Sequence, residues 1–265
     1  MKLLSFATSR SVPRLLSRLV SAPVLLALTL ITCMPVAAYA ENVNELLKTA
    51  DHFRVDSQNM QVETQITTFS RDGSIEKERR YLVFSQAGRQ SLVLMQSPAE
   101  KGQKILMLGD DFWMLLPGSQ RPLRITPMQK LLGDASIGDI ATMSWAQDYD
   151  GKLVAEERCQ TQACLHLSLT ANRKGVAYQH IDLWLGKTHH EPLKADLYVQ
   201  SEKLAKQASF IMDTVQAPSK VMEMLLLDQL SSHKETRVRY LSRQQRTVPE
   251  LWMNPMFLAK NPVLE

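Results

Sequence analysis

The sequence predicts a mainly β protein, an antiparallel sheet accompanied by a few short helices. From residue 62 onward, apolar and polar side chains alternate with a period of two, as in strands with one covered face. Turn signals such as Asp72-Gly73 and Gly109-Asp110 separate these segments at short intervals. Because no helical segments alternate with them, the strands should follow one another as a meander. The predicted strands cover residues 62–68, 75–86, 90–96, 103–108, 112–116, 123–125, 153–158, 165–169, 176–185, 193–200, 208–213, 221–227 and 235–241.

The first 40 residues resemble a secretory signal peptide. Four basic residues are the only charged ones before Glu41, and an apolar run follows over residues 23–38. This run of about 16 residues is shorter than the roughly 20 that a spanning helix needs. The small residues of Ala38-Tyr39-Ala40 suit signal peptidase. We therefore expect a signal peptide over residues 1–40, cleaved after Ala40, and a single periplasmic domain over residues 41–265.

Two alternatives remain for this segment. One is an uncleaved membrane anchor, and the other is a lipoprotein signal ending at Cys33, which Thr32 at the preceding position disfavours. Cleavage would also change the charge of the protein. The chain has 31 basic and 27 acidic residues and a net charge of +4. Removing the four basic residues of the signal leaves a neutral chain, which argues against a nucleic-acid partner.

Two cysteines remain after cleavage, Cys159 and Cys164. In an oxidising periplasm such a pair predicts a disulfide, here across a turn between two strands. A catalytic or metal-binding pair is the alternative, but there is no C-x-x-C motif and no suitably spaced histidine.

Three segments have helical patterns. Asn42 caps a predicted helix over residues 43–53, with Glu45 in its first turn. Ser136 and Asp139 form a capping box that opens a predicted helix over 137–145. Pro249 suits the first turn of a short C-terminal helix that Pro255 could kink.

The strands over 92–95, 105–108 and 112–116 are apolar on both faces, so each face must be covered. A two-residue turn at 109–110 or 110–111 would place Ile105 and Met107 on one face with Phe112 and Met114. A closed sandwich or barrel would provide the cover, and so would a curved sheet around an apolar cavity with helices as a lid. Composition and periodicity alone leave these two open, although abundant methionine suits a surface that adapts to apolar ligands.

The segment from Gly109 to Pro117 (GDDFWMLLP), followed by RPLRI at 121–125 and a Gly-Asp segment before Asp148-Tyr-Asp150, resembles the LolA-like outer-membrane lipoprotein-sorting protein family. The resemblance covers essentially the whole mature chain. It implies a curved antiparallel sheet, a half-barrel, with helices covering its concave face. It also implies a non-enzymatic periplasmic protein without a cofactor that shelters acyl chains of lipoproteins or lipids. Residues 132–139 depart from the commonest family pattern, which leaves the cargo open.

From the register and this resemblance we predict a lipid-binding cavity and a helical lid. The cavity residues are Ile105, Met107, Phe112 and Met114, and the lid contacts are Leu46, Phe53, Ile140 and Met143. Ordinary core packing is the alternative role for each of them. The expected partners are lipoprotein or lipid acyl chains, with an inner-membrane transporter and an outer-membrane acceptor. An accessory module docked on an inner-membrane exporter is the second hypothesis.

The sequence offers little for a third hypothesis, a periplasmic hydrolase. It contains no nucleophile elbow, P-loop, dinucleotide fingerprint or zincin motif. Adjacent histidines in His189-His190-Glu191 rarely bind one metal ion, and we expect no metal site. The acidic pairs at 110–111 and 148–150 are expected in turns. The basic residues from His233 to Arg246 predict a solvated strand face, or else a contact with anionic headgroups or an acidic partner.

Overall fold

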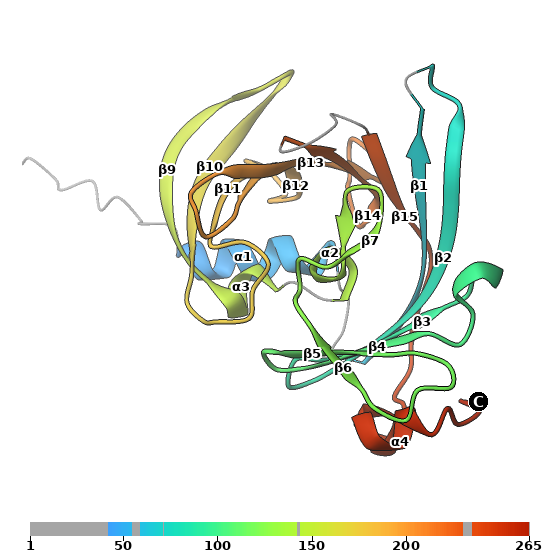
Figure 1. The fold of residues 1–265 in the computed structure, drawn as a ribbon. Helices are drawn as coiled ribbons and strands as arrows, with labels where there is room; N and C mark the ends of the chain where they lie inside the picture. The colour runs from blue at the N-terminus through green and yellow to red at the C-terminus, as the bar shows by residue number, and fades with distance from the viewer. Residues whose placement is uncertain (1–41, 55–58, 71, 142–143, 230–234, 265) are drawn as a thin grey trace, which may run out of the picture. The chain divides into compact units, whose positions relative to one another are not determined.

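The computed structural model describes residues 42–54, 59–70, 72–141, 144–229 and 235–264, all within one compact unit, Ala40–Glu265. Residues 1–41, with the predicted signal peptide, lie outside the described residues. The described chain confirms the mainly β prediction, because it forms one antiparallel sheet of 13 strands (Figure 1). The strands are β1 (Met60–Phe69), β2 (Ile75–Gln86), β3 (Gln90–Met95), β4 (Lys104–Leu108), β5 (Asp111–Leu115), β6 (Leu123–Ile125), β9 (Tyr149–Cys159), β10 (Gln162–Ala171), β11 (His180–Gly186), β12 (Pro192–Tyr198), β13 (Leu204–Met212), β14 (Val221–Asp228) and β15 (Glu235–Gln245).

The sheet consists of two meanders joined by the first and last strands. The first meander runs from β1 to β6 and the second from β9 to β15, and β1 pairs with β15 between them. The edges of the sheet are therefore β6 and β9, the strands on either side of residues 126–148 in the sequence. The sheet stays open and does not close into a barrel.

The connection from β6 to β9 must cross from one edge of the sheet to the other. It carries a short hairpin of β7 (Lys130–Leu132) and β8 (Ala135–Ser136), then α2 (Ile137–Ala141) and α3 (Trp145–Asp148). In Figure 1 the sheet curves around α1 and α2. We call this side the inner face. The crossing segment carries α2 and α3 over the inner face, and α1 packs against the same face.

Helix α1 (Val43–His52) begins as predicted at Asn42, whose side chain accepts a hydrogen bond from the backbone N–H of Asn44. Its apolar residues recur at helical spacing, and Leu46, Leu47 and Ala50 are buried. This amphipathic stripe packs against the inner face. The hydrophobic residues of one side of the helix therefore account for both its formation and its position.

The opposite, outer face of the sheet is covered near β2–β5 by the C-terminal segment. The 3₁₀ turn η2 (Glu250–Met253) and helix α4 (Pro255–Ala259) contribute Trp252, Met253 and Leu258 to a second apolar cluster. Trp252 packs edge-on against Phe84 of β2, with ring centroids 5.5 Å apart. Strands β3–β5, apolar on both sides, are therefore covered on both sides.

Three predicted elements differ from the structure. The expected helix over 137–145 is divided, because α2 ends at Ala141 and Ser144 caps a new helix, α3. The expected kinked C-terminal helix is also two elements, since Asn254 caps α4 and Pro255 occupies its first turn. The strand expected from 176 begins only at His180. A further 3₁₀ turn, η1 (Pro98–Glu100), joins β3 to β4. None of the helices in the described ranges has the length and apolar character needed to cross a membrane.

Candidate functional site: an apolar interior beneath a helical lid

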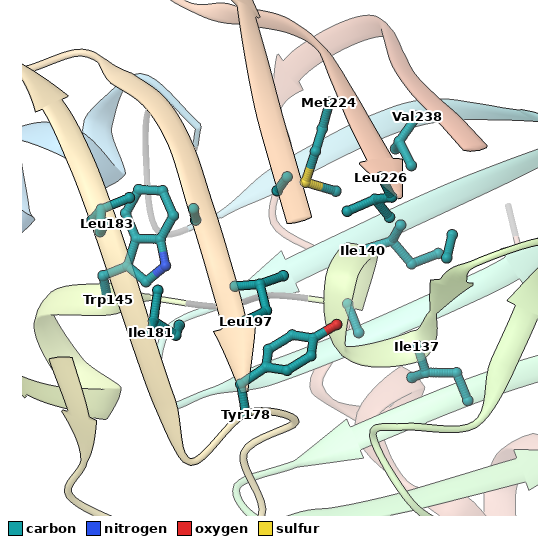
Figure 2. Close-up of a cluster of buried hydrophobic side chains, with 14 of the residues drawn as sticks. Ile137, Ile140, Trp145, Tyr178, Ile181, Leu183, Leu197, Met224, Leu226 and Val238 are labelled. Atoms are coloured by element: carbon teal, nitrogen blue, oxygen red, sulfur yellow. The ribbon is translucent and has the colours of Figure 1, made fainter. Parts of the chain in front are cut away.

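The inner face and its helices enclose one large apolar cluster, which we call the inner cluster. Figure 2 shows Ile137 and Ile140 of α2 and Trp145 of α3 among side chains from β11, β12, β14 and β15. The labelled strand residues are Ile181, Leu183, Leu197, Met224, Leu226 and Val238. These strand side chains belong to the second meander, and the first meander adds others, such as Ile66, Val83 and Ile105. The inner cluster is therefore assembled by the curvature of the sheet and by the lid.

The hairpin of β4 and β5 has the predicted two-residue turn at 109–110, with Leu108 paired to Asp111. Met107 therefore pairs with Phe112, and Ile105 with Met114. Ile105, Met107 and Phe112 belong to the inner cluster and are almost completely buried. Met114, one strand from the β6 edge, is half-buried and lies outside that cluster.

The intervening side chains of the same hairpin face outward. Leu106 is fully buried in the outer cluster under η2 and α4, and Trp113, its cross-strand partner, packs against that cluster. Leu106 and Met107 are neighbours on one strand, so their side chains point to opposite faces of the sheet and belong to the outer and the inner cluster respectively.

The predicted lid residues occupy different positions. Leu46 and Ile140 belong to the inner cluster. Phe53 is buried at the end of α1 but outside the cluster, and its backbone carbonyl accepts a hydrogen bond from the N–H of Val221. Met143 lies outside the described residues.

The described side chains around α2 pack closely against one another. A hollow of about 10 Å³ lies between Phe112, Pro127, Gly138 and Tyr149, which is about the space of one water molecule. Close packing also holds α2 in place, since a Cβ atom on Gly138 would lie 2.9 Å from Cβ of Ala177. An acyl chain entering between these residues would displace α2.

A buried polar network lies beneath α2. Lys206 Nζ on β13 donates to Asp139 Oδ2 at 2.7 Å and to Ser136 Oγ at 3.1 Å. The hydroxyl of Tyr178 donates to the other oxygen of Asp139 at 2.7 Å. The side chains of Lys206 and Asp139 are only 3% and 2% exposed. This network fixes α2 to the sheet by a buried ion pair beside the inner cluster.

The pKa values follow from these contacts. Burial alone would raise the pKa of Asp139, but the ammonium of Lys206 and the donors around the carboxylate hold it below its ordinary value. Burial and the neighbouring Asp139 raise the pKa of Tyr178 well above its ordinary value. Asp139 is therefore an anion and Tyr178 a neutral donor at neutral pH.

The two lid helices α1 and α3 are joined by one carboxylate. Asp51 accepts hydrogen bonds from Ser144 Oγ at 2.8 Å and from the backbone N–H groups of Trp145 and Ala146 at 3.0 Å. The guanidinium of Arg54 lies over the Trp145 ring, 4.2 Å from its centroid. These contacts join α1 to α3, although the two helices lie about a hundred residues apart in the sequence.

Of the acidic residues expected in turns, Asp110 lies in the β4–β5 turn, whereas Asp148 ends α3 and Asp111 and Asp150 lie in β5 and β9. Asp148 is buried at the end of α3, where Oδ1 accepts from Arg173 Nε at 2.7 Å and lies 3.3 Å from Arg89 Nε. Arg173 also pairs with Asp110 in the β4–β5 turn. The arginines thus connect the two meanders at one end of the sheet, which corrects the expectation of a turn for Asp148.

The cysteine pair and the segment His189-His190-Glu191 both lie within the described residues. Cys159 and Cys164 form the predicted disulfide at the end of the β9–β10 hairpin. In the described ranges, no group of three or more histidine, cysteine, aspartate or glutamate side chains has the arrangement of a metal site. Glu191 is buried against Gly186, and His190 occupies a left-handed turn position.

The basic stripe lies on β15 and the residues after it. Arg239 and Arg237 both pair with Glu223 on the neighbouring strand, at 2.7 and 3.4 Å. Arg246 donates to Gln61 and stands near the Phe84 and Trp252 rings. His233 lies outside the described residues. These arginines are therefore engaged by their neighbours in the described sheet.

Sequence reasoning missed Lys206, Tyr178 and Trp145 as interior polar groups. Lys206 has the inward phase of β13, two residues before Ala208 and four before Phe210, and this alternation was the available signal. Tyr178 was expected in a strand, whereas it lies in the loop before β11 and reaches Asp139 from there.

Three solved structures are similar to this chain. The LolA superfamily protein NE2245 from Nitrosomonas europaea is 28% identical, with a TM-score of 0.72 over 79% of this chain and 96% of that one. A domain from Vibrio parahaemolyticus described for outer membrane lipoprotein sorting is 18% identical, with a TM-score of 0.64 over 82% and 97%. A DUF1329 family protein from Desulfovibrio piger is 21% identical, with a TM-score of 0.65 over 81% and 97%.

Comparison with curated proteins gives no match. A family model described as "Uncharacterized protein" matches residues 87–260, more than half of the chain. The matched region runs from the β2–β3 turn to the end of α4 and includes the crossing segment with α2 and α3. The chain therefore belongs to this family of uncharacterized proteins, and its fold is that of the LolA superfamily.

Proposed function

We propose that this protein is a periplasmic carrier that shelters the acyl chains of lipoproteins or lipids between the inner face of its sheet and its helical lid. It acts by binding and release, without catalysis, and moves its cargo towards the outer membrane. Export by the signal peptide of residues 1–40 is part of this proposal. The observation that carries it is the inner cluster, an apolar layer between an open sheet and a lid that the topology lays across it.

The energetics suit a carrier. Each methylene transferred from water to an apolar interior contributes roughly 0.8 kcal/mol, so an acyl chain has a large gross affinity for such a site. The lid side chains Leu46, Leu47, Ile137 and Ile140 already occupy this interior. A cargo must displace these side chains. The net binding free energy is therefore the difference between that of the cargo on the inner face and that of the lid side chains on the same face. Closure of the lid therefore favours release, and a membrane acceptor can take the cargo.

The similar structures support the same function. The Vibrio parahaemolyticus domain is described for lipoprotein sorting, and NE2245 belongs to the LolA superfamily. At 18% identity the Vibrio domain supports the fold, and the inner cluster supports the apolar ligand.

The decisive experiment is lipid analysis of the full chain after export to the periplasm. Native mass spectrometry and organic extraction should detect co-purified acyl chains, and the delipidated protein should bind a fluorescent acyl-chain analogue reversibly. Protein that never acquires or binds an acyl chain would refute the proposal. Such protein co-purifying with an inner-membrane exporter would instead support the accessory role.

A matched pair of variants tests which face binds. Met107 and Leu106 are neighbours on β4, both buried, with side chains in the inner and outer clusters. Met107→Gln should weaken binding of the analogue by roughly 5- to 100-fold, because a buried amide without partners costs about 1–3 kcal/mol. Leu106→Gln should lower the free energy of unfolding by about 1–3 kcal/mol for the same reason. It should leave the affinity of the folded protein for the analogue unchanged. Equal losses of affinity would contradict the inner site.

A further inference from the structure

The outer face of β2–β5 is covered by the last part of the chain, residues 248–264, which we call the strap. Figure 1 shows its helix α4 on the side of β4 and β5 away from α1 and α2. Within the described residues, the backbone hydrogen bonds of the strap join only its own residues. Its apolar side chains in the outer cluster hold it on the sheet. The strap can therefore leave the sheet without breaking a ladder of strand hydrogen bonds.

Two polar contacts add to this apolar attachment. The side chain of Gln86 on β2 donates to the carbonyl of Val248 at 2.8 Å. Lys104 Nζ on β4 donates to the side-chain oxygen of Asn261, just after α4. The strap thus has one polar contact at each end, and the second of them involves a charged group.

Lys104 places a buried ammonium beneath the strap. In the sheet register it lies between Leu94 of β3 and Leu115 of β5, and the residue is only 6% exposed. Its Nζ donates to two neutral oxygens, the carbonyl of Gly102 at 3.3 Å and the side chain of Asn261. No aspartate or glutamate in the described ranges pairs with it, and burial lowers the pKa of this amine. Lys104 is therefore a buried cation whose described partners are neutral.

The strap covers this face incompletely. Hydrogen bonds from an ammonium to an amide or a carbonyl replace only part of its hydration, and a carboxylate is a stronger acceptor. Opening of the strap returns the ammonium to water. The strap also leaves three of its own apolar side chains exposed, those of Leu251, Met256 and Val263. Part of its apolar surface therefore contributes nothing to its attachment.

We propose that the outer face of β2–β5 is a docking site for a partner protein, which displaces the strap with an apolar segment that carries a carboxylate. The apolar side chains of the partner replace Trp252 and Leu258 in the outer cluster. Its carboxylate replaces the Asn261 amide at Lys104. The strap competes with the partner, because it covers the same side chains and offers the ammonium a weaker acceptor. This docking site is separate from the acyl-chain site, since the inner cluster lies on the other face of the sheet.

The first test adds the missing charge to the strap itself. Asn261→Asp places a carboxylate at the position of the amide, and aspartate tolerates the left-handed backbone of this residue, which has a φ of 50°. Hydrogen exchange of the strap amides in the full chain should slow by about 10-fold, because a charge-assisted hydrogen bond replaces a neutral acceptor. In a Lys104→Met background the same substitution should not slow it. Exchange in Asn261→Asp as fast as in the original protein would overturn the inference.

Lys104→Met alone measures the cost of the buried ammonium. Methionine keeps an unbranched side chain and removes the charge, so exchange of the strap amides should slow by roughly 5-fold or more. Lys101→Met is the matched control, since Lys101 lies just before β4 and is exposed, and it should leave the exchange unchanged. Faster exchange in Lys104→Met would show that the ammonium holds the strap in place, and would overturn the inference.

Docking itself is tested with a peptide in place of the partner. The probe has the sequence of residues 248–264 with capped ends, with and without Asn261→Asp, and its binding to the full chain is measured by fluorescence polarisation. The substituted peptide should bind about 10-fold more tightly than the unsubstituted one, and Lys104→Met should abolish this preference. Equal binding of the two peptides, or a preference that survives Lys104→Met, would overturn the docking site.

Two further measurements separate this site from other readings. Binding of phosphatidylglycerol vesicles that requires Lys104, without binding of either peptide, would place a membrane on this face and overturn the protein partner. Lys104→Met should bind an acyl-chain analogue with the affinity of the original protein, because Lys104 faces the outer cluster. A loss of that affinity in the folded variant would overturn the separation of the two sites. Absence of analogue binding in the original protein would overturn the carrier function and leave the docking site standing.

Discussion

Asp51, in the last turn of α1, accepts a hydrogen bond from the backbone N–H of Trp145, the first residue of α3, at 3.0 Å. The same carboxylate also accepts hydrogen bonds from the N–H of Ala146 and from the hydroxyl of Ser144. The N-terminus of α3 is thus capped from another helix. The lid is therefore held together by polar contacts within it, in addition to its apolar contact with the sheet.

Replacing Asp51 should loosen this lid. Asp51→Ala leaves two backbone N–H groups and one hydroxyl without their acceptor, and it should lower the free energy of unfolding by about 1–3 kcal/mol. It should also accelerate entry of an acyl-chain analogue, measured by stopped-flow fluorescence. Lys48→Ala is the control, because that side chain is exposed on the same helix and pairs with Glu45 at the surface. Similar effects of the two substitutions would contradict the junction.

The disulfide should stabilise the β9–β10 hairpin. Cys159 and Cys164 enclose a short loop, for which loop-closure entropy predicts a contribution of about 2 kcal/mol. The double substitution Cys159→Ser with Cys164→Ser should lower unfolding free energy by up to this amount, measured in urea. Reducing agent should have the same effect on the original protein and none on the variant. Insensitivity of the original protein to reduction would show that the bond contributes nothing to its stability.

The outer cluster should affect stability but not binding. Trp252→Ala removes the ring packed on Phe84, and a buried aromatic replaced by alanine typically costs about 3–5 kcal/mol. Affinity of the folded protein for an acyl-chain analogue should remain unchanged, because this ring lies across the sheet from the inner cluster. Thermal unfolding and binding are measured on the same preparation. Loss of affinity at full folding would place the ligand on the outer face.

The fold was predictable where sequence pattern is local. The turn at Gly109-Asp110 determined the pairing of Ile105 with Met114, and alternation located the strands. The sheet order was not accessible in this way, because pairing of β1 with β15 depends on residues far apart in sequence. The division of the predicted helix at 137–145 reflects a tertiary contact, since Asp51 of α1 supplies acceptors to the start of α3.

The interior polar groups were hidden for a related reason. A lysine on a strand normally indicates a solvated face, and the inward phase of Lys206 becomes meaningful only once α2 is known to bring Asp139 above it. Tyr178 was equally hidden, because its hydroxyl meets Asp139 from a loop. The apolar residues of the candidate site could thus be predicted from the sequence. Its charged residues could not, because the connection between β6 and β9 brings Asp139 next to Lys206 only in the folded chain.

The two lid carboxylates should give pH dependences of opposite sign. Burial raises the pKa of Asp51 above its ordinary 3.8, despite Arg54 and its hydrogen-bond donors. The folded protein therefore binds this proton more tightly than the unfolded chain does. The resulting stabilisation is complete below pH 3.8 and is lost as the pH rises through the raised pKa. For Asp139, whose pKa is lowered chiefly by Lys206 against the effect of burial, the stabilisation is present above pH 3.8 and is lost as the pH falls through the lowered pKa.

Asparagine at each position removes the titration and separates the two effects. Unfolding free energies in urea are measured from about pH 3 to pH 7. Asp139→Asn should be less stable than the original protein at neutral pH. The difference should shrink as the pH falls below about 3.8, where Asp139 gains a proton in the unfolded chain but not yet in the folded protein. Asp51→Asn should lack the stabilisation that declines with rising pH. The difference in unfolding free energy between this variant and the original protein should therefore change with pH in the direction opposite to that for Asp139→Asn. Parallel curves for both variants would show that neither carboxylate changes its proton affinity on folding, and would contradict the burial and pairing described for the lid.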